Sequence, residues 1–502
     1  MDRSVAQGRP ADAAAVQPIV GPRERGLAVV AGILLAVAAL VIYLVTRTDR
    51  FYDHFVWQAA AFLEGQAAIR YPVEGVGSSV GNWFFQDVLP VASTDGVPRG
   101  VLPFPPLPAI VLLPFVAIFG LATDDQTIFT FLAAIDVAVC WWMLGRLRLS
   151  PPVRVGTTVF FAFGTVFWYT AQLATTWYQA HILAVGLALL AVGLALGEDP
   201  EAQDDEPGFD DPDWRPVERS VEGSVEGLAP PSAWRHVLAI DRRQFVIGFL
   251  FGLAATARLT VIFAAPFFML VGSGNGWWRR SWSAGLGAVI PVGLLLAYNI
   301  ASTGQLLHPA YDYLYRLETA SYAALGYQPE WSVEDPRYLP QNGAIMFLTG
   351  PDLFPTRLPD SLGVNDTPVC QGPGAARGLL DVSCPMAVPR DIGMSVLLTS
   401  PAFLLLIPAL RRYGRSRLIS GAAVAVLAVV LVNLMHFSQG WVQFGYRFSN
   451  DAVPFALPLV ALGFQRLRDS GRRWAMPFAM GLVVLSIAVN AWGVAWGTLL
   501  RW

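Results

Sequence analysis

Asp53 and His54 stand side by side just after the first apolar run of the sequence. The apolar residues around them recur on one face of a helix, at positions 51, 55, 59, 62 and 63. The segment is too short and polar to cross a bilayer, so we expect it along the membrane interface, with Asp53 at the mouth of a helical bundle. A carboxylate there can serve as a general base toward a hydroxyl or amine. The alternative is a helix-capping aspartate beside a solvated histidine.

Arg258 interrupts a second apolar stretch, residues 244–273. An arginine at the centre of a membrane span costs about 2.5–3.5 kcal/mol. If this stretch forms two short helices, Arg258 lies at the outer turn between them and can hold an anionic headgroup, because a guanidinium binds phosphate through paired hydrogen bonds. The alternative is an arginine that snorkels to the interface or bridges two helices.

A third candidate is the aromatic segment 440–454, which contains Tyr446 and Arg447. Asp451 follows Arg447 by one helical turn, so the alternative interpretation is an aromatic belt with a local ion pair. Asp136 lies deep in another apolar run and is assigned no role. The sequence has no phosphate-binding P-loop, no dinucleotide-binding glycine motif, no serine-nucleophile elbow and no metal-ligand spacing among its histidines.

The composition is that of a membrane protein. Of 502 residues, 54% are hydrophobic and only 14% are charged, against about 25% in soluble chains. A net charge of −3 provides no basic field for nucleic acid, so we expect no nucleic-acid partner. The chain contains no lysine, which indicates a GC-rich bacterial genome.

We predict an all-α polytopic membrane protein with about eleven transmembrane helices, interfacial helices and one re-entrant segment. The predicted spans are 26–46, 127–146, 153–170, 178–197, 244–257, 259–273, 283–301, 391–409, 417–436, 451–466 and 474–496. The apolar run 103–120 contains five prolines, which disfavour a straight helix, so we expect it to enter and leave the membrane on one side.

Arginines in the short loops set the orientation in the plasma membrane. Four basic loops, which contain Arg146, Arg279, Arg411 and Arg466, are predicted to be cytoplasmic together with the N-terminus. The segments then predicted outside are 47–126, 171–177, 302–390, 437–450 and the C-terminus. The predicted parts are a disordered tail at 1–25, an N-terminal transmembrane module at 26–301, an outer loop at 302–390, and C-terminal helices at 391–502, with a flexible cytoplasmic linker at 198–243 inside the module.

Two of the three cysteines, Cys370 and Cys384, share the predicted outer loop. A disulfide between them is chemically allowed if that loop is extracytoplasmic, and two free thiols are the alternative. Cys140 lies in an apolar run and is interpreted as a packing residue.

Three motifs, in order along the chain, resemble those of the GT-C superfamily of membrane glycosyltransferases, in particular protein O-mannosyltransferases and the lipid A aminoarabinose transferase. Asp53-His54 followed by Leu63 and Gly65 resembles the acidic signature after that family's first helix. The run from Phe104 through its Pro-Pro pair to Phe119-Gly120 resembles the stretch that closes the first outer loop. Tyr446-Arg447-Phe448 followed by Pro454 resembles an aromatic-Arg-aromatic motif before a late helix.

The resemblance implies transfer of a sugar from a polyprenyl-phosphate donor, by direct displacement, to an extracytoplasmic lipid, glycan or protein acceptor. It implies that Asp53 is the base and that Arg447 binds the donor phosphate. His54 and Tyr446 are neighbouring substrate-binding candidates, and Arg258 joins them from the position of its turn.

This sequence departs from the family pattern at two positions. His54 stands where glutamate is common, and Phe104 replaces a basic residue for which Arg99 is the candidate substitute. Metal-dependent relatives carry acids in the second outer turn, whereas 172–181 has none, so we expect no metal and no cofactor besides the lipid-linked donor. The rival interpretations are a transporter or flippase of a lipid-linked or polar solute, and a non-catalytic membrane assembly protein.

Overall fold

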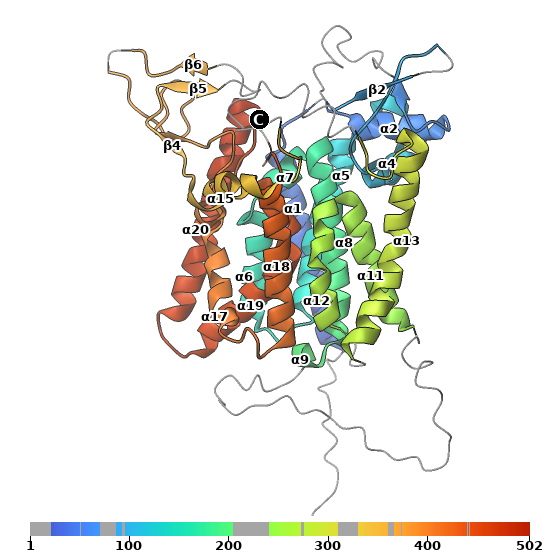
Figure 1. Cartoon of the computed structure of the whole chain (residues 1–502). Helices are drawn as coiled ribbons and strands as arrows, with labels where there is room; N and C mark the ends of the chain where they lie inside the picture. The colour runs from blue at the N-terminus through green and yellow to red at the C-terminus, as the bar shows by residue number, and fades with distance from the viewer. Residues whose placement is uncertain are drawn as a thin grey trace, which may run out of the picture.

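The computed structural model describes residues 22–50, 52–70, 87–92, 96–203, 240–272, 276–309, 330–359, 366–372, 374–438, 440 and 442–502. The long helices stand side by side in a single bundle, with small β-sheets at one end only (Figure 1). Most of the predicted tail at 1–25 and most of the predicted linker at 198–243 lie outside the described residues, and residues 22–25 of that tail already belong to a helix. The fold is therefore all-α in its membrane part, as predicted.

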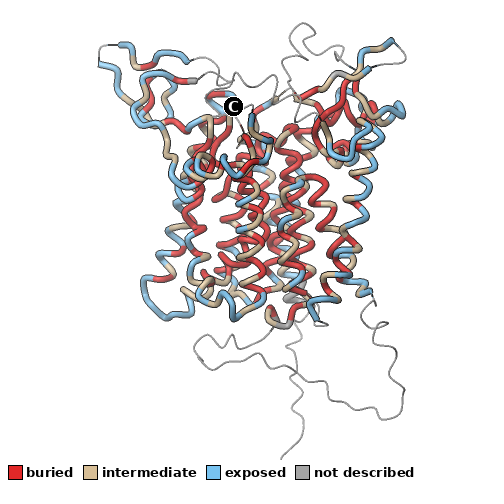
Figure 2. Tube along the Cα trace, in the orientation of Figure 1, coloured by how far each residue is buried: buried red, intermediate tan, exposed pale blue. Residues whose placement is uncertain are grey.

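Among the described residues, six helices are long and apolar enough to cross a membrane. They are α1 (Pro22–Val45), α5 (Asp125–Leu144), α8 (Thr176–Glu198), α13 (Trp277–Thr303), α18 (Arg417–Met435) and α20 (Ala475–Leu500). Their outward faces carry exposed apolar side chains, for example Leu34 on α1 at 63% exposure, whereas the buried residues fill the centre of the bundle (Figure 2). This distribution suits a bundle surrounded by lipid.

The other predicted spans are short or broken, so eleven continuous spans are not confirmed. The shorter helices are α6 (Pro151–Phe163), α7 (Phe167–Leu173), α11 (Arg242–Ala257), α12 (Ala265–Leu270), α16 (Val396–Thr399), α17 (Leu406–Leu410) and α19 (Val453–Asp469). Short 3₁₀ turns precede α12 at η2 (Leu259–Ala264), α17 at η6 (Pro401–Leu405) and α19 at η7 (Arg447–Asp451). Proline and glycine explain two of the breaks, because Gly164 ends α6 and Pro401 opens η6.

Where α11 and α13 meet, glycine lets the helices touch. A Cβ atom at Gly248 would lie 1.9 Å from the carbonyl oxygen of Ala284, and one at Gly287 would lie 2.1 Å from that of Phe245. No side chain fits in either gap. Small residues at helix contacts are typical of membrane proteins, where close backbone packing replaces a hydrophobic driving force.

The loops divide between two ends of the bundle. At one end, hydrogen bonds join Arg243 to Glu198, Arg417 to Glu201 and Gln465 to Ser150. At the other, they join Arg47 to Asp124, Arg258 to Asp451 and Thr48 to Thr498. The basic loops thus share the first end, as the arginine pattern predicted, and the chain's C-terminus lies at the second (Figure 1). We call the second end the outer end, and its extracytoplasmic location stays a prediction.

The proline-rich run forms a short helix, α4 (Leu107–Phe119), followed by the 3₁₀ turn η1 (Gly120–Ala122). Soon after η1, Asp124 meets Arg47, which follows the outer end of α1. At the other end of α4, the chain comes from β3 (Arg99–Val101), also at the outer end (Figure 1). Both ends of α4 therefore lie on one side of the bundle, as expected of a segment that does not cross the membrane.

Helix α2 (His54–Leu63) lies at the outer end of the bundle (Figure 1) and is largely buried. His54, Phe55, Val56, Trp57, Gln58, Ala59 and Ala61 are all buried, which leaves little of the helix for a water-facing side. Its cover comes from α4 and from a three-stranded sheet in the order β1 (Ile69–Arg70), β3, β2 (Leu89–Val91). Protein therefore covers most of this helix, and its position at the membrane interface stays a prediction.

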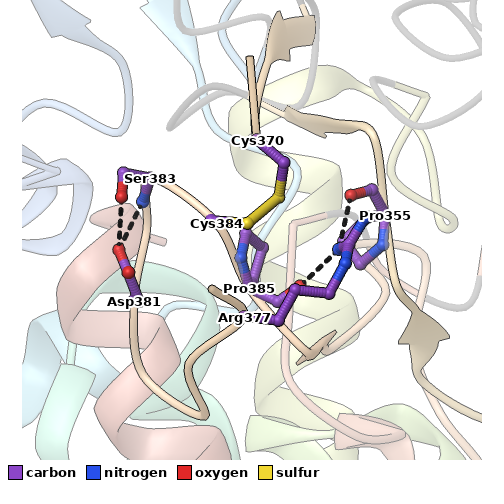
Figure 3. The surroundings of a disulfide bond; sticks show 7 residues. All are labelled: Pro355, Cys370, Arg377, Asp381, Ser383, Cys384 and Pro385. Carbon is purple, nitrogen blue, oxygen red and sulfur yellow. Dashed lines mark hydrogen bonds between the residues drawn. A yellow bond between two sulfur atoms is a disulfide. The ribbon is translucent and has the colours of Figure 1, made fainter. Parts of the chain in front are cut away.

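The predicted outer loop contains two small two-stranded sheets. β4 (Asp352–Leu353) pairs with β7 (Ala387–Val388), and β5 (Arg357–Pro359) pairs with β6 (Asp366–Pro368), each antiparallel. A disulfide joins Cys370 to Cys384, while Arg377 donates to the carbonyl oxygens of Pro355 and Pro385 at 3.0 and 2.7 Å (Figure 3). Buried side chains of this loop pack on the end of α20, including Trp496 and Trp502.

Removal of the disulfide should loosen this loop without unfolding the bundle. The disulfide joins cysteines 14 positions apart, and such a link stabilises by about 2–4 kcal/mol because it restricts the unfolded chain. We therefore expect the double variant Cys370→Ala/Cys384→Ala to exchange backbone amide hydrogens about 30-fold faster or more in segment 352–388. Hydrogen–deuterium exchange followed by mass spectrometry measures this directly. Cys140→Ala, which changes the buried free cysteine of α5, is the control and should leave that segment unchanged.

Candidate active site

Residues in the first turn and a half of α8 contact several other segments at the outer end of the bundle. The hydroxyl of Thr176 donates to the carbonyl oxygen of Tyr52 at 2.8 Å and lies 3.1 Å from Nδ1 of His54. Since the hydroxyl hydrogen is used on Tyr52, His54 donates its Nδ1–H to Thr176. Both neighbours of Asp53 are thereby fixed to α8.

Asp53 occupies the N-cap position of α2 but caps nothing, because its side chain makes no capping hydrogen bond. The carboxylate is half-buried, and burial, reinforced by the nearby charge of Asp124, raises its pKa to about 6. His54 is fully buried, and that burial lowers its pKa to about 3, so it is neutral. The interpretation of a capping aspartate beside a solvated histidine is therefore wrong on both counts.

The chain before Asp53 is held to the start of α5. Arg47 binds both carboxylate oxygens of Asp124 at 3.1 and 3.2 Å. The side chain of Gln126 accepts from the backbone of Arg50 at 2.9 Å and donates to the carbonyl oxygen of Thr48 at 3.2 Å. Gln179 of α8 donates to Asp125. Asp53 thus sits on a backbone that is fixed on both sides, as a catalytic carboxylate requires.

Arg447 lies beside the same part of α8. Its guanidinium carbon is 5.5 Å from the ring centre of Tyr178 and 5.3 Å from that of Phe448. Its Nε atom is buried without an acceptor, and no ion pair joins Arg447 to an acid in the described part of the chain. Gly440 makes room for it, since a Cβ there would lie 2.8 Å from Nε. Within the described residues, Arg447 is therefore a cation without a protein counter-ion.

Asp451 is the centre of a buried cluster that sequence reasoning assigned to the wrong partner. It pairs with Arg258, through Nε at 3.2 Å and Nη2 at 3.0 Å, and not with Arg447. It also accepts from Thr260 at 2.7 Å and lies 2.9 Å from Nδ1 of His181. The alternative interpretation of a local ion pair between Arg447 and Asp451 is therefore wrong, because Asp451 is paired with Arg258 instead.

Arg258 does lie at a turn between two short helices, as one of the two alternatives predicted. It ends α11 in an extended conformation, with φ −136° and ψ 104°, and η2 follows. Its guanidinium carbon lies 4.9 Å from the ring centre of Phe448, the same ring that contacts Arg447. The two arginines therefore share one place at the outer end, although Arg258 is already bound to Asp451.

The remaining candidates are placed as follows. Tyr446 is fully buried, and its ring meets Phe448 edge-on at 6.2 Å. Arg99 lies on β3 and donates to the carbonyl oxygen of Ala68 at 3.4 Å, so it belongs to the outer sheet. Asp136 of α5 is buried and packs against Gly186 of α8. A Cβ atom at position 186 would lie 2.1 Å from Oδ1 of Asp136.

Sequence reasoning missed the polar side chains at the start of α8. Thr176, Tyr178, Gln179 and His181 contact, in turn, the Asp53 segment, Arg447, Asp125 and Asp451. At 1.5 Å per residue, positions 176 and 181 are roughly 7.5 Å apart along the helix axis. Polar residues in the first turns of an otherwise apolar span were the available signal. Among the described residues, no group of three or more His, Cys, Asp or Glu side chains is arranged to hold a metal ion.

Comparison with known proteins gives a weak likeness of fold. No protein-family model matches the sequence, and no curated protein does. Three solved structures of the oligosaccharyltransferase of Archaeoglobus fulgidus are similar to this chain. The apo form has a TM-score of 0.42, and a form tethered to an acceptor peptide containing the NVT sequon has a TM-score of 0.44. The complex with an inhibitory peptide and a dolichol-phosphate has a TM-score of 0.43. Each is 11% identical and covers 93% of this chain, which spans 55–56% of theirs. A likeness at this level assigns neither family nor activity.

Proposed function

We propose that the protein is a membrane glycosyltransferase of the GT-C superfamily, which moves a sugar from a polyprenyl-phosphate donor to a lipid, glycan or protein acceptor at the outer face. The observation that carries the proposal is that two charged side chains without an ionic partner in the described part of the chain, Asp53 and Arg447, are positioned by the start of α8. Asp53 stands between Tyr52 and His54, which both contact Thr176, and Arg447 contacts Tyr178. One is a base near neutrality, the other an anion-binding cation.

The two groups suit a direct displacement at the anomeric carbon. Asp53 takes the proton of the acceptor hydroxyl or amine as that atom bonds to the anomeric carbon, and the bond to the lipid phosphate breaks. Arg447 donates N–H groups to the departing phosphate, whose negative charge grows as the bond breaks. The activated donor provides the driving force, so the proposal includes no cofactor, nucleotide or metal ion, and a chelator should leave transfer unchanged.

Arg258 is a weaker candidate than Arg447 for binding the donor phosphate. Two of its nitrogen atoms already donate to Asp451, and its side chain is 20% exposed. Its stronger role in the proposal is to neutralise Asp451, since an unpaired carboxylate there would repel the donor phosphate. Arg447 then remains the cation available to the substrate.

Transfer should depend on pH through Asp53. Only the ionised carboxylate accepts a proton, and burial, with the charge of Asp124 added, raises its pKa to about 6. We therefore expect kcat/KM to rise tenfold per pH unit below about pH 6 and to level off above it. Initial rates across the acid and neutral range measure this profile. Asp124→Asn removes the neighbouring negative charge, so its profile should shift to lower pH, and an unshifted profile would argue against Asp53 as the titrating group.

The direct test is transfer from a panel of polyprenyl-phosphate sugars to endogenous acceptors in purified membranes. Product with the wild type, lost with a folded Arg447→Gln variant, supports the proposal. Product that persists with Arg447→Gln keeps the enzyme but removes Arg447 from its site. Absence of transfer from every donor, with the protein intact, would reject the proposal.

One feature favours a second function, that of a lipid-linked solute transporter. The helices α6–α7 and α11–η2 are interrupted, and interrupted helices commonly form transporter sites. A flippase would move the labelled lipid between leaflets of a vesicle without changing it chemically. Chromatography of the recovered lipid distinguishes movement from sugar transfer.

A further inference from the structure

His181 lies beyond Tyr178 on α8, completely buried, with no role in the reaction described above. Its Nδ1 atom is 2.9 Å from Oδ1 of Asp451. The same carboxylate receives hydrogen bonds from Arg258, from the hydroxyl of Thr260 and from the amide of Asn433. A carboxylate bound to an arginine and surrounded by donors acts only as an acceptor. His181 therefore carries its hydrogen on Nδ1.

This tautomer leaves a lone pair on Nε2 of His181. That atom is buried and has no hydrogen-bond donor in the described part of the chain. A buried acceptor without a donor is costly, so its natural complement is an O–H or N–H group brought by another molecule.

His181 and Arg447, the cation whose Nε lacks an acceptor, contact the same aromatic ring, that of Phe448. The ring of His181 is 6.0 Å from that of Phe448, and the guanidinium carbon of Arg447 is 5.3 Å from the same ring. Both His181 Nε2 and Arg447 Nε are buried and unsatisfied. The surroundings of Phe448 thus contain an acceptor suited to a hydroxyl and donors suited to an anionic oxygen. A sugar attached to a phosphate presents those two groups a few bonds apart.

We propose that His181 binds the sugar of the lipid-linked donor, with Nε2 accepting a hydrogen bond from a ring hydroxyl while Arg447 binds the phosphate. Asp451 is a positioning residue, which fixes the tautomer of His181 from behind. This inference rests on the proposed function and adds a specificity-determining contact to it, because a site built to bind a hydroxyl rejects the analogue that lacks it.

The test compares two ligands on the whole purified protein in detergent: polyprenyl-phosphate sugars (mannose, glucose and arabinose) and bare polyprenyl phosphate. His181→Asn keeps an N–H group toward Asp451 and removes the acceptor at the Nε2 position. We expect it to weaken binding of the preferred sugar-bearing lipid roughly 10- to 100-fold and to leave binding of the bare lipid unchanged. Arg447→Gln is the matched variant and should weaken both.

A second measurement keeps the test valid if His181→Asn does not fold. Among donors that each lack one sugar hydroxyl, one should bind wild type roughly 10- to 100-fold more weakly than its parent. In a folded His181→Asn protein, that same donor and its parent should bind equally well. Equal losses of affinity for both lipids in His181→Asn, or no loss of affinity for any deoxy donor, would overturn the role of His181 and leave the proposed function standing. If wild type binds neither lipid, the proposed function fails as well.

Discussion

Asp53→Asn should lower the rate of sugar transfer by about 10²- to 10⁴-fold, the usual contribution of a general base. The substitution keeps the size and shape of the side chain and removes only its ability to accept a proton. Because the Asp53 side chain makes no capping hydrogen bond, its loss breaks no helix cap. Initial rates at saturating donor, with protein amounts matched by gel filtration, measure the effect.

The fold should survive this substitution. The folded state raises the pKa of Asp53 to about 6, which means that it favours the protonated, neutral form. A neutral amide is therefore expected to leave the thermal stability unchanged or slightly higher at neutral pH. Asp49→Asn is the matched control, since Asp49 lies four positions earlier, pairs with Arg47 and is 88% exposed. Equal activity loss in both variants would contradict a specific role for Asp53.

Asp451→Leu should destabilise the protein by about 3–5 kcal/mol, because it leaves Arg258 in a mostly buried place without its counter-ion. Asp451 is fully buried, and it also holds Thr260 and His181. The fraction of protein that remains monodisperse after heating in detergent gives the shift in apparent unfolding temperature.

Two further variants separate charge from packing. The double variant Arg258→Met/Asp451→Leu has no unpaired charge, so most of the lost stability should return. Asp352→Asn is the surface counterpart: its pair with Arg390 has a separation of 2.8 Å but about half-exposed side chains, so a change below about 1 kcal/mol is expected. If Asp352→Asn and Asp451→Leu were equally harmful, burial would not explain the effect.

The division of the loops between two ends could be predicted from the sequence because arginines cluster in short loops. The re-entrant position of α4 was predictable because its prolines exclude a straight span. The breaks within the spans were not predictable from the sequence. The breaks at Gly164 and Arg258 leave backbone groups without helical hydrogen bonds, so they depend on which neighbours can accept or donate in their place. Local composition does not specify those neighbours.

The site was predictable in its parts but not in its pairings. Asp53, Arg258 and Arg447 were singled out by residue type and position. The partner of Asp451 was not identified, because Arg258 is 193 positions away. On a regular helix, Arg447 would be one turn from Asp451 and an equally good partner for its charge. Arg447 and Asp451 lie at the two ends of η7, and a 3₁₀ turn has no strong sequence signature.

The pairing of Arg258 with Asp451 also has a consequence in time. A ribosome that adds about 5–20 residues per second takes roughly 10–40 s to cover the 193 positions between them. For almost all of that interval α11 and α12 are already made, and the guanidinium at their turn has no Asp451 to bind. The buried cluster at the outer end can form only after Asp451, near the C-terminal end of the sequence, has been made.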